Sequence, residues 1–302
     1  MLDDNPQDKL VQSETTKQVI CGTCDGFCPV SAKVKDGRVV KVTPRSDPIL
    51  KDVLCMKGAF APKAFAHPDR VLYPLKRVGA RGEGKWERVS WDSALDDICD
   101  RLKKVVDQYG PEAFAVAHSG GWLLGDNGLT RRFMNHLGSP NFITGVAYCA
   151  GNTAAINRFV YGWFPRADIF NSKCIVLIVQ DPRKSEHAER ADVWLPLRAG
   201  TAAAMQLGWL NVMIEEGLYD KEFVRDWTVG FDELAERVRE YPLDRVASIT
   251  GVDAERIQKA ARMYATEGPS CIPWTPITDQ QVSSTSAIRL QCMLRAVAGH
   301  LD

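Results

Sequence analysis

The stretch "CGTCDGFCPV", residues 21–30, places three cysteines within eight residues. Together with Cys55 it gives the spacing C-x2-C-x3-C-x26-C. Structural zinc sites usually take their ligands as two short pairs. Three ligands on one loop with a distant fourth suit the more widely spaced corners of a cubane cluster. We therefore predict that Cys21, Cys24, Cys28 and Cys55 bind a [4Fe–4S] cluster; a zinc site is the second reading and two disulfides are the third.

The composition is that of an ordinary globular protein. The 302 residues are 45% hydrophobic and 25% charged, and 38 Lys and Arg balance 38 Asp and Glu. A balanced charge does not favour binding to nucleic acid or to an anionic membrane. The start, "MLDDNPQDKLVQSETTKQ", has no apolar signal core. We therefore expect residues 1–18 to form a mobile tail, and we expect a cytoplasmic protein without a membrane segment. In such a protein cysteines bind metal more readily than they form disulfides.

Beyond the cysteine loop the pattern changes twice. Asp36-Gly37 lies between two β-prone runs, which predicts a hairpin. Residues 56–89 are rich in Pro, Gly and charge and read as irregular. From Trp91 onward helical and strand-like periodicity alternate, and this alternation is typical of an α/β fold with a largely parallel sheet. The helices are expected at residues 95–109, 128–137, 152–161, 202–216, 231–239, 253–267 and 285–299, and the strands at residues 113–118, 141–144 and 174–180.

Six further segments carry a resemblance to a known family. They are "CMKG" (55–58), "HPDRVLYPLKRVG" (67–79), "WERVSWDSALDDI" (86–98), "AYCAGN" (147–152), "DPRKSEHAERADVWLPLRAGT" (181–201) and "GLYDKEFVRDWTVGFDEL" (217–234). With the cysteine loop they resemble the DMSO reductase superfamily, the molybdopterin oxidoreductases with an N-terminal [4Fe–4S] cluster. "RRFMNHLGSPN" (131–141) and "IPWTPITDQQVSSTSAIRLQCMLRAVAG" (272–299) are similar to its acetylene hydratase branch.

The resemblance implies a fold and a set of cofactors. The fold is a small β-rich iron–sulfur domain at residues 19–75, followed by Rossmann-like α/β domains with a parallel sheet at residues 76–302. The cofactors are one [4Fe–4S] cluster and a bis-molybdopterin guanine dinucleotide that holds tungsten or molybdenum. The implied protein is an enzyme that acts on a small organic substrate. An electron-transfer partner is expected if the chemistry is redox.

The same resemblance assigns roles to three residues near the metals. Asp25 becomes the proton donor, since a carboxyl group in an apolar pocket can stay neutral at pH 7; taken alone, it reads as a solvated loop aspartate. Cys149 becomes the protein ligand of molybdenum or tungsten, a role that suits a soft thiolate; taken alone, it reads as a core cysteine. Lys57 is implied to lie between the cluster and a pterin, and a surface lysine is an equally good reading.

Further residues are implied to bind the pterin cofactor or to line the substrate pocket. The expected cofactor-binding residues are Lys57, Gly151, Asn152, Asp181, Arg183 and Thr201. The pocket residues are Trp122, Ala150 and Trp274. Gly26 and Ala150 stand where the hydratase branch has bulkier side chains, so the resemblance implies a pocket of different shape.

The sequence departs from the family in three places. "CIVLIVQDPR" (174–183) joins two strands that the family separates by a helix, and a βαβ crossover takes at least about 10 residues. A crossover is therefore expected to be missing near residue 178. Ala202 replaces a family aspartate. The chain ends at Asp302, where the family continues into a C-terminal domain, so we expect an incomplete chain.

Three functions remain in competition at this point. The first is a molybdenum or tungsten enzyme in which a water or an oxo group held at the metal reacts with substrate, either with electron transfer or as a hydration with Asp25 as proton donor. The second is a cluster-bearing electron-transfer or binding fragment that lacks a working pterin site. The third, a zinc ribbon that binds nucleic acid, is disfavoured by the balanced charge.

Overall fold

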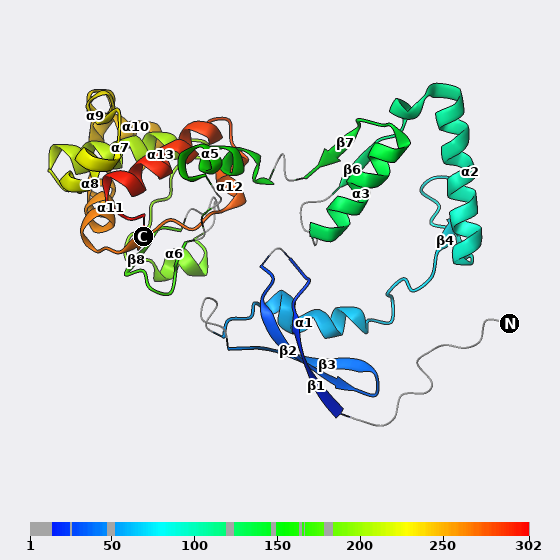
Figure 1. Ribbon diagram of the computed structural model, residues 1–302. Helices are drawn as coiled ribbons and strands as arrows, with labels where there is room; N and C mark the ends of the chain where they lie inside the picture. Colours follow the sequence, from blue (N-terminus) through cyan, green and yellow to red (C-terminus); the bar gives the residue numbers. More distant parts are fainter. Residues whose placement is uncertain are drawn as a thin grey trace. The chain divides into compact units, whose positions relative to one another are not determined.

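The chain divides into two compact units, Met1–Gly145 and Val146–Asp302. The computed structural model describes residues 14–24, 26–46, 52–118, 124–145, 149–162, 165, 167–177 and 184–301. The first unit contains the small N-terminal sheet, and the second contains most of the helices (Figure 1). The protein is therefore a mixed α/β chain, as the alternating periodicity predicted.

The N-terminal sheet is an antiparallel meander of three strands, β1 (Glu14–Ile20), β2 (Pro29–Lys35) and β3 (Arg38–Pro44). The turn between β2 and β3 is the predicted Asp36-Gly37 pair, and both residues have positive φ, 49° and 72°. A two-residue turn of this type matches the twist of the strands that it joins. Val30 and Ala32 of β2 are buried, whereas β1 is exposed along its whole length.

Two elements next to the cysteine loop differ from the sequence-based expectation. β1 begins at Glu14, inside the stretch expected to be a mobile tail, because β2 pairs with it and a Lys33–Glu14 ion pair joins the two strands. Helix α1 (Met56–Phe65) lies in the segment expected to be irregular. Pro62 and Gly58 conceal this helix in the sequence, since both residues have poor helix propensity.

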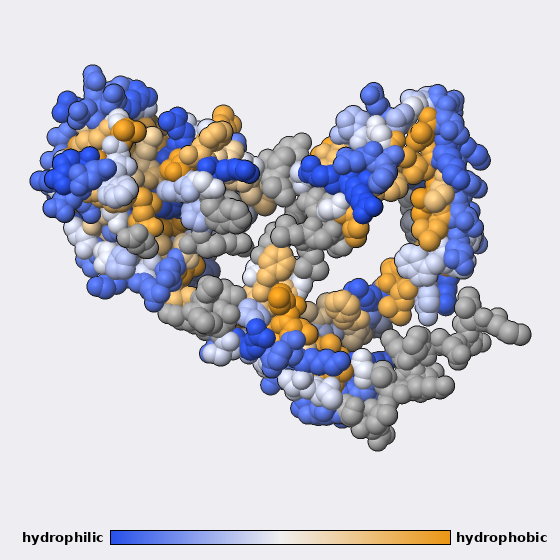
Figure 2. All heavy atoms as spheres, viewed as in Figure 1, coloured by the Kyte–Doolittle hydropathy of each residue, from blue (hydrophilic) through white to orange (hydrophobic). Residues whose placement is uncertain are grey.

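From Trp91 onward the first unit follows the predicted alternation, but two short strands at residues 75–77 and 86–88 also lie in the segment expected to be irregular. The elements after α1 are β4 (Leu75–Arg77), β5 (Trp86–Arg88), α2 (Trp91–Tyr109), the 3-10 turn η2 (Pro111–Ala113), β6 (Val116–His118), α3 (Leu124–Leu137) and β7 (Phe142–Thr144). β6 and β7 pair in parallel, with α3 as the crossover between them. The apolar side of α2 is largely uncovered: Leu95 and Ile98 are each more than half exposed, and Figure 2 shows a hydrophobic stripe along this helix.

The second unit is built around helix α7. Its elements are α5 (Gly151–Tyr161), β8 (Cys174–Ile175), α6 (Glu186–Arg190), α7 (Ala202–Glu215), α8 (Lys221–Trp227), α9 (Phe231–Arg239), α10 (Leu243–Thr250), α11 (Ala254–Thr266), β9 (Ser270–Cys271), α12 (Pro276–Asp279) and α13 (Ser284–Val297). Leu210 and Met213 of α7 are fully buried against residues of α10, α11 and α13. β8 and β9 pair in parallel beside this core.

The predicted helices of the second unit are confirmed to within two residues at each end. Helices α6, α8, α10 and α12 were not predicted, because each has eight residues or fewer and so offers too short a stretch for helical periodicity to be recognised. The strand expected at residues 174–180 is shorter than predicted: β8 ends at Ile175, and residues 176–177 are not part of a strand. Residues 178–180 lie outside the described residues. None of the described helices combines the length and the apolar character that a membrane crossing requires.

An ion pair ties the end of α7 to α11 and gives the unit a testable pH dependence. The Glu216 carboxylate accepts hydrogen bonds from Arg262 Nε at 2.7 Å and Nη2 at 2.9 Å, and from Gln258 Nε2 at 2.8 Å. These hydrogen bonds, chiefly those from Arg262, hold the pKa of Glu216 below its usual range. A group with a lowered folded-state pKa stabilises the fold above its unfolded pKa, and this contribution disappears as the pH falls through the folded pKa.

We therefore expect Glu216→Gln to lower the free energy of unfolding at pH 7 by about 1 kcal/mol or less, because the pair is partly exposed. The difference from wild type should shrink as the pH falls below about 4.3, the ordinary pKa of glutamate. Urea unfolding at pH 7 and in acid measures both values. Glu236→Gln on the exposed side of α9 is the matched control. An equal loss at both pH values would contradict the assignment.

Candidate iron–sulfur and pterin sites

The three N-terminal cysteines lie on a loop between β1 and β2 whose two ends are hydrogen-bonded to each other. Ile20 pairs with Pro29 at the end of the ladder, and the N–H of Cys21 donates to the carbonyl of Cys28 at 2.8 Å. Within the loop Phe27 takes a positive φ of 46°, which a non-glycine residue seldom adopts. The sheet therefore holds both ends of the loop together, and the left-handed residue turns the chain back just before Cys28.

Two glycines show how closely the cysteine sulfurs are grouped. A Cβ atom built on Gly26 would lie 3.4 Å from the Sγ of Cys24 and 3.5 Å from the Sγ of Cys28. A Cβ atom built on Gly58, in the first turn of α1, would lie 3.3 Å from the Sγ of Cys21. The loop and the start of α1 therefore meet at the sulfur atoms, with glycine where they come closest.

The fourth cysteine occupies the N-cap position of α1. Cys55 precedes the helix in an extended conformation, and the backbone N–H groups of Gly58 and Lys57 face its sulfur. The pKa of the Cys55 thiol is lowered, chiefly by the backbone N–H of Gly58. The backbone N–H and the positive charge of Lys57 lower it further. Helix N-termini stabilise thiolates in this way. Lys57 itself is exposed beside Cys55.

The four thiols lie close enough to influence one another. The pKa of Cys28 is raised, first by burial and then by the negative charges of Cys21, Cys24 and Cys55. An iron–sulfur cluster would relieve this repulsion, because iron takes each thiolate as a ligand. Across the described residues no three His, Cys, Asp or Glu side chains are placed to share one metal ion. A cubane has a different requirement, since each of its four irons takes one thiolate.

The fit between α1 and the cysteine loop can be tested at Gly58. A Cβ atom there would lie 2.5 Å from Leu54 Cδ1, so Gly58→Ala is expected to push either Leu54 or the loop away. We predict that the variant loses iron several times faster than wild type on exposure to a chelator. Because Leu54 is the closer obstacle, Leu54→Ala in the same chain should restore most of the retention. Equal loss in the double variant would show that the loop, and not Leu54, gives way.

In the second unit the predicted metal ligand Cys149 lies just before helix α5. Its thiol is half-buried, Ala150 is the N-cap, and Gly151 and Asn152 form the first turn. The Nδ2 of Asn152 donates to the hydroxyl of Ser284 at 2.6 Å. Asn152 therefore joins the start of α5, the helix that follows Cys149, to the start of α13.

A residue that the sequence analysis missed holds the same end of α5. Ala150 provides no side-chain cap for α5. Asp279 of α12 supplies one instead: its carboxylate accepts from the backbone N–H of Thr153 at 2.9 Å and from the Thr153 hydroxyl at 2.6 Å. It also accepts from Trp274 Nε1 at 3.1 Å. An anion at a helix N-terminus is stabilised by the helix dipole.

The remaining predicted residues fall into two groups. Thr201 is the N-cap of α7, but its hydroxyl donates to the carbonyl of Arg198 at 2.6 Å and makes no capping bond. Trp274 is part-buried and held by Asp279. Four predicted residues lie outside the described residues: Asp25, Trp122, Asp181 and Arg183. Gly26, where the resemblance implies a pocket of different shape, lies beside the sulfurs of Cys24 and Cys28.

Two consecutive family matches cover the chain from β1 to α6. Residues 14–67 match the family described as "Molybdopterin oxidoreductase Fe4S4 domain". Residues 70–188 match the family described as "Molybdopterin oxidoreductase". The first match contains all four cysteines of the predicted cluster, together with Lys57, and the second contains Cys149, Gly151 and Asn152.

Individual relatives agree with these matches. The chain is 47% identical to "Acetylene hydratase" of Syntrophotalea acetylenica over 94% of its own length and 43% of the relative's. It is 31% identical to "Dimethyl sulfoxide reductase DmsA" of Haemophilus influenzae, over 91% of this chain and 42% of that relative. The solved structure "Acetylene Hydratase from Pelobacter acetylenicus" matches with a TM-score of 0.78 and 46% identity, over 94% of this chain and 44% of that chain.

Two facts about length accompany these matches. The chain spans less than half the length of the curated relatives it matches. The alignment with the Syntrophotalea protein runs over 314 positions, but 94% of 302 residues is about 284. At least about 30 of the aligned positions therefore have no residue in this chain.

Proposed function

The chain belongs to the molybdopterin oxidoreductases, and on that premise we propose that it binds one [4Fe–4S] cluster through Cys21, Cys24, Cys28 and Cys55. The observation that carries this proposal is the grouping of the four thiols by the β1–β2 loop and the N-terminus of α1. The donor set is entirely thiolate, and the backbone N–H groups of α1 face one of the four sulfurs. Both features are typical of cluster sites.

The second part of the proposal is a bis-molybdopterin guanine dinucleotide centre that contains tungsten or molybdenum. Such a centre supplies two-electron redox chemistry or activates a bound substrate as a Lewis acid. Cys149 is proposed as the protein ligand of the metal, with Gly151 and Asn152 in the first turn of α5 beside the pterin cofactor. The half-buried thiol on a helix end that Asp279 caps supports this role, since ligands need a rigid support.

Other proposed contacts with the cofactor come from residues of several segments. Lys57 is proposed to contact a pterin from the cluster side, and its exposed ammonium group beside Cys55 is consistent with that role. Thr201, Asp181 and Arg183 are proposed to bind the dinucleotide, because arginine pairs with phosphate and a carboxylate accepts from the guanine edge. The Thr201 hydroxyl already donates a hydrogen bond to the carbonyl of Arg198, so it would accept a hydrogen bond from the dinucleotide.

We propose hydration of a small unsaturated molecule, such as acetylene, as the reaction. The 47% identity to an acetylene hydratase supports it, against 31% to a dimethyl sulfoxide reductase. In this proposal Asp25 holds the proton that is transferred to the substrate, and Trp122, Ala150 and Trp274 shape the pocket. The indole of Trp274 is fixed by its bond to Asp279, as a pocket wall requires.

Oxidoreduction of a small organic substrate is the second candidate. Ala150 favours it, because a small side chain at that position leaves space for a substrate larger than acetylene. A cytoplasmic location is expected for either activity, and an electron-transfer partner is expected only for oxidoreduction.

Assays with and without an electron acceptor separate the two candidates. The full chain, produced anaerobically in a host that makes the pterin cofactor, is incubated with acetylene in the presence or absence of an artificial acceptor. Hydration predicts acetaldehyde formation that is independent of the acceptor. Turnover of an organic substrate only in the presence of an acceptor or donor would favour oxidoreduction. A chain that contains about four irons but neither molybdenum nor tungsten, and that shows no turnover, would be an electron-transfer or binding fragment.

A further inference from the structure

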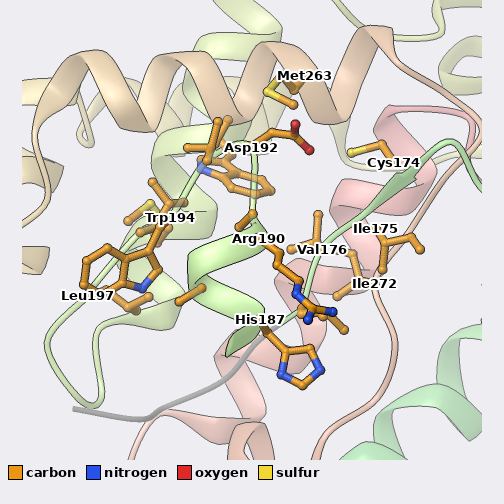
Figure 3. A pocket seen from close by; sticks show the side chains of 18 of the residues that line it. Cys174, Ile175, Val176, His187, Arg190, Asp192, Trp194, Leu197, Met263 and Ile272 are labelled. Atoms are coloured by element: carbon orange, nitrogen blue, oxygen red, sulfur yellow. The ribbon is translucent and has the colours of Figure 1, made fainter. Parts of the chain in front are cut away.

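A cavity of about 690 Å³ lies in the second unit, between β8 with the residues after it and the segment that follows α6. Figure 3 shows Ile175 and Val176 on one side of this space and Asp192 and Trp194 on the other. Residues 178–183, which continue the chain from the β8 wall, lie outside the described residues. The described residues therefore form only part of the walls of this space.

In the first unit, by contrast, all four cysteine sulfurs of the proposed cluster are described, and backbone groups donate hydrogen bonds to two of them. The N–H of Gly26 donates to Cys24 Sγ at 3.4 Å. The N–H of Gly58 faces the sulfur of Cys55 at the start of α1. Hydrogen bonds to the sulfurs are one of the factors that set the reduction potential of an iron–sulfur cluster. Because these two donors belong to the backbone, a change of side chain does not remove them.

A side chain makes the hydrogen bond at a third sulfur. The Cys21 thiol donates to the hydroxyl of Thr23, with 3.3 Å between Sγ and Oγ1. A thiolate that is bound to iron has no proton, so it can only accept, whereas a hydroxyl can both donate and accept. The direction of this hydrogen bond therefore reverses when Cys21 binds iron. Hydrogen bonds to a charged acceptor are about twice as strong as those between neutral groups, so the bond also becomes stronger.

The contact between Cys21 and Thr23 is local. The two residues are two positions apart on one loop, and the N–H of Cys21 donates to the carbonyl of Cys28 at 2.8 Å, which fixes the start of that loop. Thr23 is β-branched, so its χ1 angle has few favourable values. Valine has the same shape, and in place of Thr23 it would put a methyl group where the hydroxyl lies. The exposed position of Thr23 tolerates this change.

We propose that the Thr23 hydroxyl donates a hydrogen bond to the sulfur of Cys21 in the cluster-bound protein and thereby raises the reduction potential of the cluster. The inference rests on the proposed cluster but not on the pterin cofactor or the reaction. Reduction adds one electron from an external one-electron reductant, and Thr23 keeps its proton, so no covalent bond forms or breaks. Because part of the added negative charge lies on the sulfurs, the hydroxyl stabilises the reduced form more than the oxidised form.

A redox titration of the anaerobically purified full chain, followed by electron paramagnetic resonance of the reduced cluster, measures this potential. For Thr23→Val we expect the equilibrium constant for reduction to fall about threefold to tenfold. This change lowers the potential by about 30–60 mV, since a tenfold change corresponds to about 59 mV for one electron. Thr23→Ser keeps the hydroxyl and should retain most of the wild-type potential. Thr16→Val, on the exposed strand β1, is the matched control and should leave the potential unchanged.

Iron content and visible absorption are measured on every variant, which separates loss of the cluster from a change in its potential. If Thr23→Val lost its iron, Thr23→Ala would give the same measurement; its shift should have the same sign but be smaller, because water can enter the vacated space. Equal potentials of the wild type and the iron-loaded Thr23 variants would overturn the role of Thr23 and leave the cluster proposal intact. A shift in Thr23→Ser as large as that in Thr23→Val would also overturn this role. Absence of iron from the wild type would overturn the cluster proposal and this inference together.

Discussion

Replacement of Cys28 by serine is expected to remove most of the cluster iron from the protein. Burial, and then the negative charges of Cys21, Cys24 and Cys55, raise the pKa of Cys28, so its thiol lies close to the other three. Its replacement removes one of the four proposed ligands. Serine keeps the size of the side chain but provides a hard oxygen in place of the soft thiolate that iron–sulfur clusters require. We expect iron per chain to fall from about four to a small fraction, with loss of the visible absorption of the cluster.

Cys99→Ser is the matched control for this experiment. Cys99 is an exposed cysteine of helix α2 in the same unit, outside the four-cysteine set. The control variant should keep its iron and its absorption. If Cys28→Ser retained the wild-type amount of iron, the cluster would not be held by this cysteine. If both variants lost iron equally, the loss would reflect general damage to the unit.

Replacement of Asp279 by alanine is expected to produce the second large effect. The change leaves three donors without their acceptor: the N–H and hydroxyl of Thr153 and the indole N–H of Trp274. Unpaired buried donors cost about 1–3 kcal/mol each, and because the losses are not additive we expect a total of about 3 kcal/mol. Urea unfolding of the full chain measures it. Glu236→Ala, at an exposed site of α9, should change stability by less than about 0.5 kcal/mol.

Asp279→Asn separates the charge from the hydrogen bonds. The amide keeps one oxygen for the Thr153 N–H, but its nitrogen cannot accept from Trp274 Nε1. We therefore expect a loss of stability between those of the wild type and the alanine variant. In protein loaded with the pterin cofactor, molybdenum or tungsten should dissociate faster from Asp279→Ala than from Glu236→Ala, because Asp279 holds the helix that begins beside Cys149. Equal stability of all three Asp279 forms would contradict the capping role.

The four cluster ligands were predicted from the sequence because the pattern that indicates them is local. Three of the cysteines lie on one short loop, and this spacing favours a cubane over a zinc site. The sheet that closes this loop was only partly predicted. β1 begins in a polar stretch and is exposed along its length, so no apolar alternation marks it, and its pairing with β2 makes it a strand.

Asp279 could not be found in the same way because its partner is far away in the chain. Thr153 lies 126 residues before it, and "TPITDQQ" reads as a polar surface loop. One signal did exist: Ala150 leaves the predicted helix at residues 152–161 without a capping side chain, so an acceptor from elsewhere was needed.

Elemental analysis of the anaerobically purified full chain tests the central claim most directly. The account predicts about four irons per chain, together with molybdenum or tungsten when the host supplies the pterin cofactor. Iron without either metal would support the cluster and contradict the pterin site. One zinc per chain with no iron would contradict the account at its foundation, because Cys21, Cys24, Cys28 and Cys55 would then hold a single ion instead of a cluster.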